Sequence, residues 1–97
     1  MQRKQKPQAR VEFSSRFDED IDKAPLEVQI AFRGIYELFQ ENQNNEILRN
    51  HSLNKLGKRY HGLWSIDVTD DCRAIYRKKR MTIIFIMLRT HEQLYGK

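Results

Sequence analysis

The stretch that decides the fold covers residues 62–89 and reads GLWSIDVTDDCRAIYRKKRMTIIFIMLR. Hydrophobic and polar residues alternate at its start, and this period of two is typical of a β-strand. Two clusters of turn-forming or charged residues, 69–71 and 78–80, divide the stretch into three strands joined by short turns. The last strand, 81–89, is apolar on both faces, which predicts a position inside the sheet.

The half of the chain before this stretch has a helical pattern. Apolar residues recur at three- and four-residue spacing over 25–42, which predicts one amphipathic helix with Pro25 in its first turn. A shorter helix is expected before it, capped by Ser14 or Ser15 and entered through acidic residues that complement the helix dipole. Residues 11–13 alternate in polarity and predict a further short strand.

This order of elements predicts an α+β fold in which two N-terminal helices cover one face of a twisted, mostly antiparallel, four-stranded sheet. A single domain is expected over residues 10–97, preceded by a flexible basic tail at 1–9. The face of the sheet that the helices leave uncovered should be available for function. Asp67 should lie on that face, because it alternates with the apolar residues of its strand.

Composition limits the protein to a small chemical inventory. Its 97 residues, 39% of them hydrophobic, suffice for one modest core. The single cysteine, Cys72, excludes an intramolecular disulfide, and no apolar run approaches the roughly 20 residues that cross a bilayer. Residues 1–7 lack the apolar segment of a secretory signal, so a cytoplasmic protein without membrane contact is expected.

Positive charge is concentrated in the second half of the chain. The formal net charge is +5, and residues 51–97 carry 10 Lys/Arg against 4 Asp/Glu, whereas residues 1–50 carry 8 against 9. Such segregation favours nucleic acid as a partner, ahead of an acidic protein segment or a role in solubility alone. The basic residues expected to contact a phosphate backbone are Lys55, Lys58, Arg59, Arg77, Lys78, Lys79 and Arg80.

Cleavage of RNA without a metal needs a base for the ribose 2′-hydroxyl, cations for the phosphorane and an acid for the leaving oxygen. The sequence offers histidines, aspartates and arginines for these roles, and the candidates are His51, Asp67, Asp71, Arg73, Arg89 and His91. Each also fits an ordinary loop, turn or salt bridge, so none decides the function alone. No zinc-type spacing and no glycine-rich phosphate loop is present, so neither a metal nor a cofactor is expected.

Four short segments occur in a characteristic order and spacing: HSL at 51–53, GLWSIDV at 62–68, DCRAIY at 71–76 and THEQLY at 90–95. Through them, residues 10–95 resemble the RelE/ParE superfamily of bacterial type II toxins, and within it the RelE-like mRNA interferases, including the YafQ-like branch. The resemblance implies helices packed on a twisted antiparallel sheet. It also implies cleavage of mRNA, commonly in the ribosomal A site, and restraint by a cognate antitoxin.

The resemblance also implies a set of site residues drawn from two branches. The YafQ-like positions are His51, Asp71, His91 and Tyr95, with Asp67 standing where that branch has a histidine. The RelE positions are Arg73, Arg89 and Tyr95. The implied roles are His91 as general acid, His51 or an aspartate as base or orienting group, the arginines as phosphate stabilisers and Tyr95 as a stacking platform. The implied partners are an antitoxin, mRNA and the 70S ribosome, with a toxin–antitoxin hetero-oligomer as the assembly.

Two other functions remain open at this point. A ParE-like toxin that poisons DNA gyrase without nuclease chemistry would have the same fold, because fold does not fix function. A catalytically inactive module that binds an antitoxin or RNA is the other alternative. The pair His51 and His91 favours RNA cleavage, since ParE-like members generally lack it.

Overall fold

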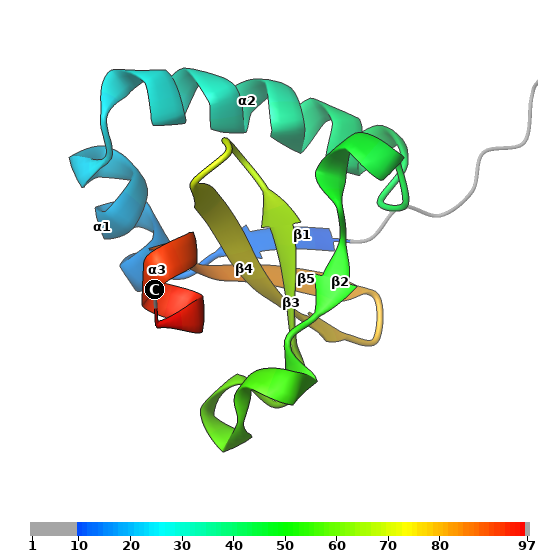
Figure 1. The fold of residues 1–97 in the computed structure, drawn as a ribbon. Helices are drawn as coiled ribbons and strands as arrows, with labels where there is room; N and C mark the ends of the chain where they lie inside the picture. The colour runs from blue at the N-terminus through cyan, green and yellow to red at the C-terminus, as the bar shows by residue number, and fades with distance from the viewer. Residues whose placement is uncertain (1–9, 97) are drawn as a thin grey trace, which may run out of the picture.

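A five-stranded sheet forms the centre of the computed structural model, which describes residues 10–96 (Figure 1). Its strands are β1 (Arg10–Phe13), β2 (His51–Ser52), β3 (Leu63–Asp67), β4 (Cys72–Lys79) and β5 (Thr82–Thr90). The helices are α1 (Ser15–Lys23), α2 (Leu26–Glu41) and α3 (His91–Tyr95), with one-turn 3₁₀ helices η1 (Glu46–Leu48), η2 (Asn54–Leu56) and η3 (Lys58–Tyr60). The basic tail expected at residues 1–9 lies outside the described residues.

The strands lie in the order β1-β5-β4-β3-β2, with β1 parallel to β5 and the other neighbours antiparallel. This confirms the predicted α+β fold and the interior position of β5. The expected number of four strands is corrected to five, because the two-residue β2 is too short to show a period of two. The turn expected at 78–80 lies instead at Arg80 and Met81, since β4 continues through Lys79.

The two N-terminal helices form where the sequence predicts them. The helix expected over 25–42 is α2, Leu26–Glu41, with Pro25 at its N-cap. Ser14 caps α1 by accepting a hydrogen bond from the Phe17 N–H at 3.0 Å. The same Ser14 hydroxyl donates to the carbonyl of Ile86 at 2.8 Å, which attaches the start of α1 to β5 beyond the end of β1.

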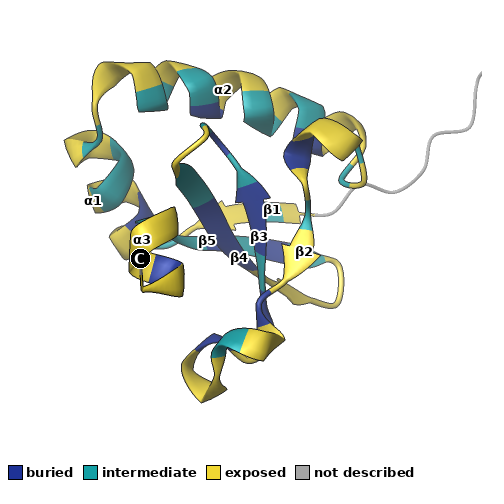
Figure 2. Cartoon of the chain, viewed as in Figure 1, coloured by how far each residue is buried: buried dark blue, intermediate teal, exposed yellow. Residues whose placement is uncertain are grey.

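The face of the sheet toward α1 and α2, called the helix face below, holds an aromatic core. Most of β3 and the middle of β4 are buried (Figure 2). Phe85 is at the centre of the core and has no exposed surface. Six aromatic rings have centroids within 6.2 Å of the Phe85 ring: Phe13, Phe17, Phe32, Tyr36, Phe39 and Tyr76. Aromatic side chains of this size supply most of the apolar area that such a small domain can bury.

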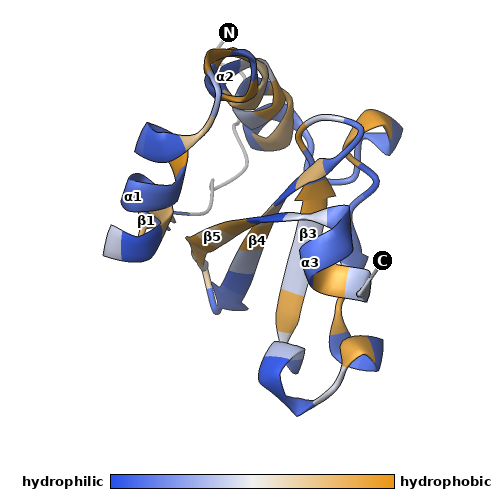
Figure 3. Cartoon of the chain, turned by 60° about the vertical axis from the view of Figure 1, so that its left-hand side comes forward, coloured by the Kyte–Doolittle hydropathy of each residue, from blue (hydrophilic) through white to orange (hydrophobic). Residues whose placement is uncertain are grey.

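The opposite face, called the far face below, is partly covered, which corrects the expectation that it would be left free. A second cluster of buried residues lies there, formed by Leu53, Tyr60, Leu63, Ile75 and Leu94. These residues bring η3 and α3 against the sheet, and α3 presents hydrophilic residues around the one that it buries (Figure 3). The part of the far face that this cluster leaves uncovered lies along the strand ends next to α3. We call it the polar strip, and its residues are His51, Asp67, Arg73, Arg89, His91 and Tyr95. Within residues 10–96, no helix combines the length and apolar composition needed to cross a bilayer.

Candidate functional site

The sheet register brings three predicted site residues side by side on the far face. Asp67 of β3 is paired with Arg73 of β4, and Arg73 is paired with Arg89 of β5. Asp67 therefore lies opposite the helix face, as its alternation with Ile66 and Val68 predicts. One carboxylate and two guanidinium groups, on three neighbouring strands, therefore form the start of the polar strip.

A β-bulge is the reason that Arg89 joins this strip. Ile75 is paired with Met87 and the next residue, Tyr76, with Phe85, which leaves one extra residue in β5. Strict alternation would put Arg89 on the same side as Phe85, in the aromatic core. The bulge reverses the alternation, so the side chain of Arg89 shares a face with Arg73.

Asp67 and Arg73 form the least exposed polar contact of the strip. The Asp67 carboxylate lies 3.1 Å from Nε of Arg73 and 3.5 Å from Nε of Arg49, and the Arg73 side chain is only 12% exposed. Arg73 also donates to the carbonyls of Thr69 at 3.1 Å and Asp70 at 3.0 Å. Arg73 thus holds the β3–β4 turn and Asp67 in place, and the Asp67 charge is compensated by two guanidinium groups.

A cluster of two histidines and a tyrosine lies beside Asp67, Arg73 and Arg89. Its members are His51, His91 and Tyr95. Nε2 of His51 lies 3.4 Å from the Tyr95 hydroxyl, and the rings of His91 and Tyr95 have centroids 4.5 Å apart. Both histidines and Tyr95 are exposed to solvent. Residues separated by about 40 positions in the sequence therefore form one accessible cluster, with β2 supplying one histidine and α3 the other.

The short helix α3 has its own local supports. Thr90 and Gln93 form a capping box, with the Gln93 N–H donating to the Thr90 hydroxyl at 3.0 Å and the Thr90 N–H donating to the Gln93 side chain at 2.8 Å. The His91 N–H donates to the carbonyl of Asp71 at 2.8 Å. Asp71, predicted as a site residue, thus contacts the His91 backbone through its own backbone carbonyl.

Arg49 is the functional candidate that the sequence reasoning missed. Its backbone is left-handed, with φ 50°, and its carbonyl oxygen lies 2.7 Å from Nδ1 of His51. Asparagine adopts this conformation more readily than arginine, so a sequence signal would have favoured the adjacent Asn50. Asn50 instead accepts a hydrogen bond from the buried Tyr76 hydroxyl at 2.8 Å, which anchors the segment before His51 to the core.

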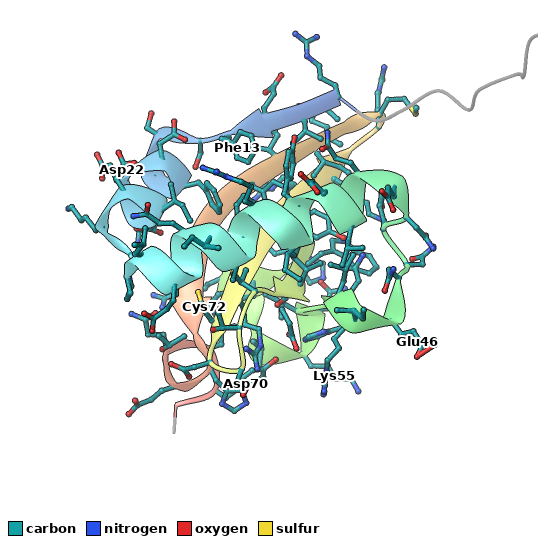
Figure 4. The ribbon with its side chains drawn as sticks, turned by 90° about the horizontal axis from the view of Figure 1, so that it is seen from above. Phe13, Asp22, Glu46, Lys55, Asp70 and Cys72 are labelled. Atoms are coloured by element: carbon teal, nitrogen blue, oxygen red, sulfur yellow. The ribbon has the colours of Figure 1, made fainter. Side chains whose placement is uncertain are left out.

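The basic residues predicted to contact phosphate lie on η2, on η3 and at the end of the β4–β5 hairpin. Lys55, on η2, and Lys58 and Arg59, on η3, are exposed, and Lys55 extends outward from the body of the molecule (Figure 4). The exposed residues at the end of the β4–β5 hairpin are Arg77, Lys78, Lys79 and Arg80. Lys78 does not join the others, because its Nζ lies 4.5 Å from the centre of the Trp64 ring on the helix face.

Two groups of β4 that face the aromatic core have shifted pKa values. Burial raises the pKa of the Cys72 thiol to about 11, with a further contribution from the negative charge of Asp71. Burial also raises the pKa of Tyr76 to about 12, against the effect of its hydrogen bond to Asn50. Both groups are therefore protonated at neutral pH, and Tyr76 is held as the donor to Asn50.

Solved structures match this fold over nearly the whole chain. YafQ from E. coli strain BL21(DE3) is 20% identical, with a TM-score of 0.71 over 92% of this chain and 100% of YafQ. A chain of the E. coli DinJ-YafQ toxin-antitoxin complex is 20% identical, with a TM-score of 0.70 over 93% of this chain and 100% of its own length. A YoeB/ParE toxin from Agrobacterium tumefaciens is 14% identical, with a TM-score of 0.64 over 84% of this chain and 98% of that toxin.

No protein-family model matches the sequence, and no curated protein matches it. The resemblance to the RelE/ParE superfamily is confirmed at the level of the fold, because the structural neighbours are toxins of the YafQ and YoeB/ParE types.

Proposed function

We propose that this chain, which has the fold of the YafQ and YoeB/ParE toxins, is the toxin of a type II toxin–antitoxin system and acts as an endoribonuclease on mRNA. One observation carries the proposal. His51 and His91 contact the same residue, Tyr95, on an exposed surface beside Arg73 and Arg89. Two histidines and two arginines provide an acid, a base and the positive charge that RNA cleavage needs.

His51 is the base in this proposal. Its Nδ1 faces a carbonyl oxygen, which can only accept a hydrogen bond, so Nδ1 carries the proton and Nε2 has the free lone pair. Asp67, the competing base, has both carboxylate oxygens in ion pairs, one with Arg49 and the other with Arg73, so neither oxygen is free to face the substrate. The geometry therefore favours the histidine over the aspartate for this role.

In the proposed reaction, the ribose 2′-oxygen attacks the adjacent phosphorus atom while His51 Nε2 takes the 2′-hydroxyl proton. The bond between phosphorus and the 5′-oxygen breaks, and His91 gives its proton to that oxygen. The products are a 2′,3′-cyclic phosphate and a 5′-hydroxyl end. Arg89 and Arg73 stabilise the negative charge on the phosphorane, and Tyr95 stacks on a base of the substrate.

Basic residues outside the strip, on η2 and η3 and at the turn of the β4–β5 hairpin, are proposed to contact the phosphate backbone without reading its sequence. They are Lys55, Lys58, Arg59, Arg77, Lys79 and Arg80. Lys78, which lies on the helix face, is left out of this set. Contacts of this type would serve either free mRNA or mRNA in the ribosomal A site, and we propose the ribosome as the setting because the resembled interferases act there.

The proposed regulator is an antitoxin that covers the basic surface with an acidic segment that folds on binding. The support is the fold match to the DinJ-YafQ toxin-antitoxin complex together with the net charge of +5. A toxin of this kind would act in the cytoplasm, where mRNA and ribosomes are found, with residues 10–97 as a single toxin domain.

The test is incubation of purified protein with mRNA, with and without ribosomes, followed by mapping of the cut ends. We expect cleavage that leaves a 5′-hydroxyl end and that is lost when the antitoxin is added. A parallel assay of DNA gyrase supercoiling separates the ParE-like alternative. Inhibition of gyrase with intact mRNA would overturn the proposal, and binding of mRNA without cleavage would indicate an inactive module.

A further inference from the structure

The segment that leads into β2 contains a strained residue next to the proposed base. Arg49 follows η1 and has φ 50° and ψ 48°, the left-handed conformation that residues with a Cβ atom rarely adopt. Such strain persists only where the surrounding structure imposes it, and it is found most often near functional sites. The reason for it here lies in what the two ends of Arg49 contact.

The side chain of Arg49 contacts Asp67, the acid that is paired with Arg73 in the sheet. Its Nε lies 3.5 Å from one Asp67 oxygen, while Nε of Arg73 lies 3.1 Å from the other. Because the Arg49 side chain is 76% exposed, this ion pair alone would be weak. A second anchor is adjacent, since Asn50 accepts from Tyr76 at 2.8 Å and donates to the Gln43 carbonyl at 3.0 Å.

The backbone of Arg49 contacts the proposed base. Its carbonyl oxygen lies 2.7 Å from Nδ1 of His51, a distance typical of a strong hydrogen bond. The opposite tautomer, with its proton on Nε2, would place two lone pairs against each other at this distance. It would also leave no lone pair on the nitrogen that faces the Tyr95 hydroxyl, 3.4 Å away.

We propose that Arg49 is a positioning residue. Its left-handed backbone, held by the ion pair with Asp67 and by Asn50, fixes His51 in the tautomer whose free lone pair is on Nε2. Arg49 acts through His51 and takes no part in the reaction itself. The effect on the tautomer stands without any enzymatic activity, whereas its catalytic consequence depends on the proposed function. The same contacts connect His51, the proposed base, to Arg73, a proposed phosphate stabiliser, because Asp67 contacts both Arg49 and Arg73.

The first test is long-range ¹H–¹⁵N NMR of the His51 imidazole at a pH where the ring is neutral. Arg49→Val removes the side chain and disfavours the left-handed backbone, whereas Arg49→Gly removes the side chain and permits that backbone. We expect the Nδ1–H tautomer to dominate in the wild type, and to dominate less strongly in Arg49→Gly, which permits the left-handed backbone but loses the ion pair that helps to hold it. Arg49→Val should lower the ratio of Nδ1–H to Nε2–H by about tenfold, the value of one hydrogen bond. Arg49→Ala is the milder second variant if Arg49→Val does not fold.

The matched control for backbone strain is Arg80, the other described residue outside glycine with a positive φ. Arg80→Val imposes the same change at the β4–β5 turn, and the His51 tautomer should not respond. A wild-type tautomer ratio in folded Arg49→Val or Arg49→Ala would overturn the proposal. An equal shift in Arg80→Val would also overturn it, because the effect would then not belong to Arg49.

The second test separates positioning from substrate binding by steady-state RNA cleavage. Arg49→Val should lower kcat in proportion to the fraction of His51 that loses the Nδ1–H tautomer, by at most about tenfold, with little change in KM, because the tautomer shift acts on the base alone. Arg33→Ala, on the exposed side of α2, should leave both constants unchanged. A rise in KM at constant kcat would make Arg49 a substrate contact and overturn its positioning role. Absence of cleavage by the wild type would end the proposed function, while the NMR result would still decide the tautomer.

Discussion

The same strands present different residues on the two faces of the sheet, aromatic residues on the helix face and charged residues on the far face. On the helix face, Phe85 and its neighbours Phe17, Phe32, Phe39 and Tyr76 form a buried aromatic core, and the more exposed rings of Phe13 and Tyr36 lie at its margin. On the far face, Asp67, Arg73 and Arg89 lie in register, and the exposed His51 and His91 lie beside them. The larger core of the helix face supplies most of the buried apolar area, and the smaller cluster on the far face leaves room beside it for exposed, charged and strained residues.

The largest effect should come from opening the helix face. Phe85→Ala removes a fully buried ring and leaves a cavity among aromatic neighbours, so the free energy of unfolding should fall by about 3–5 kcal/mol. Urea denaturation followed by circular dichroism measures the loss. Ile30→Ala is the matched control, because Ile30 is 62% exposed on α2 and its change should stay within about 0.5 kcal/mol. Equal losses for the two variants would contradict the assignment of the core.

A smaller loss of stability is expected from the far face. Asp67→Asn removes the carboxylate shared by Arg49 and Arg73 and leaves the Arg73 side chain, 12% exposed, without its partner. The cost should be about 1–3 kcal/mol, since a little-exposed charge loses its compensation. Glu12→Gln breaks the exposed ion pair with Arg10 and should cost at most about 1 kcal/mol. If Asp67→Asn costs no more than Glu12→Gln, the ion pairs of Asp67 contribute no more to stability than an exposed surface pair.

The junction between α1 and β5 should respond less. Ser14→Ala removes the cap of α1 and the hydrogen bond to the Ile86 carbonyl, which should cost about 1 kcal/mol. Thermal unfolding of Ser14→Ala and of Ser15→Ala, the neighbouring exposed serine, provides the comparison. A larger loss for Ser15→Ala would move the cap to the other serine and contradict the geometry.

The smallest expected effect concerns Cys72, a partly buried thiol packed against the aromatic core at the start of β4. Because its pKa is raised from 9.0 to about 11, the folded protein should react with iodoacetamide at pH 8 at least about tenfold more slowly than the unfolded chain. The folded state holds the thiol proton more tightly, so this contribution to stability is complete below pH 9 and is lost as the pH rises toward 11. The measurement is the rate of Cys72 alkylation with and without urea. Equal rates in the folded and unfolded chain would contradict the raised pKa of Cys72.

Sequence patterns predicted the helix face better than the far face. The spacing of apolar residues over 25–42 predicted α2 to within one residue at each end, because burial of one helix face imposes that period. The strand from Leu63 to Asp67 followed from alternation in the same way. Repeating patterns of this kind arise wherever one side of an element packs against a core.

The arrangement of residues on the far face depends on irregular backbone features, which a periodic sequence pattern does not predict. Arg89 reaches it only through the bulge between β4 and β5, against strict alternation from Phe85. The strand β2 has only two residues, and the left-handed backbone of Arg49 contradicts the preference of its residue type. Long-range pairing imposes all three features, so local sequence could identify the candidate residues of the site but not their arrangement.

The chemistry that we propose for the far face is acid–base cleavage of RNA by His51 and His91. Its most direct measurement is the single-turnover cleavage rate of an RNA mapped to one cut site, for the wild type, His51→Ala and His91→Ala. Each variant should lose about 10²-fold to 10⁴-fold in rate at an unchanged unfolding temperature, because each removes one proton-transfer group from an exposed surface. The same RNA with 2′-deoxyribose at the cut position should resist the wild type. Cleavage of that RNA at the normal rate, or full activity in both folded alanine variants, would contradict the claim.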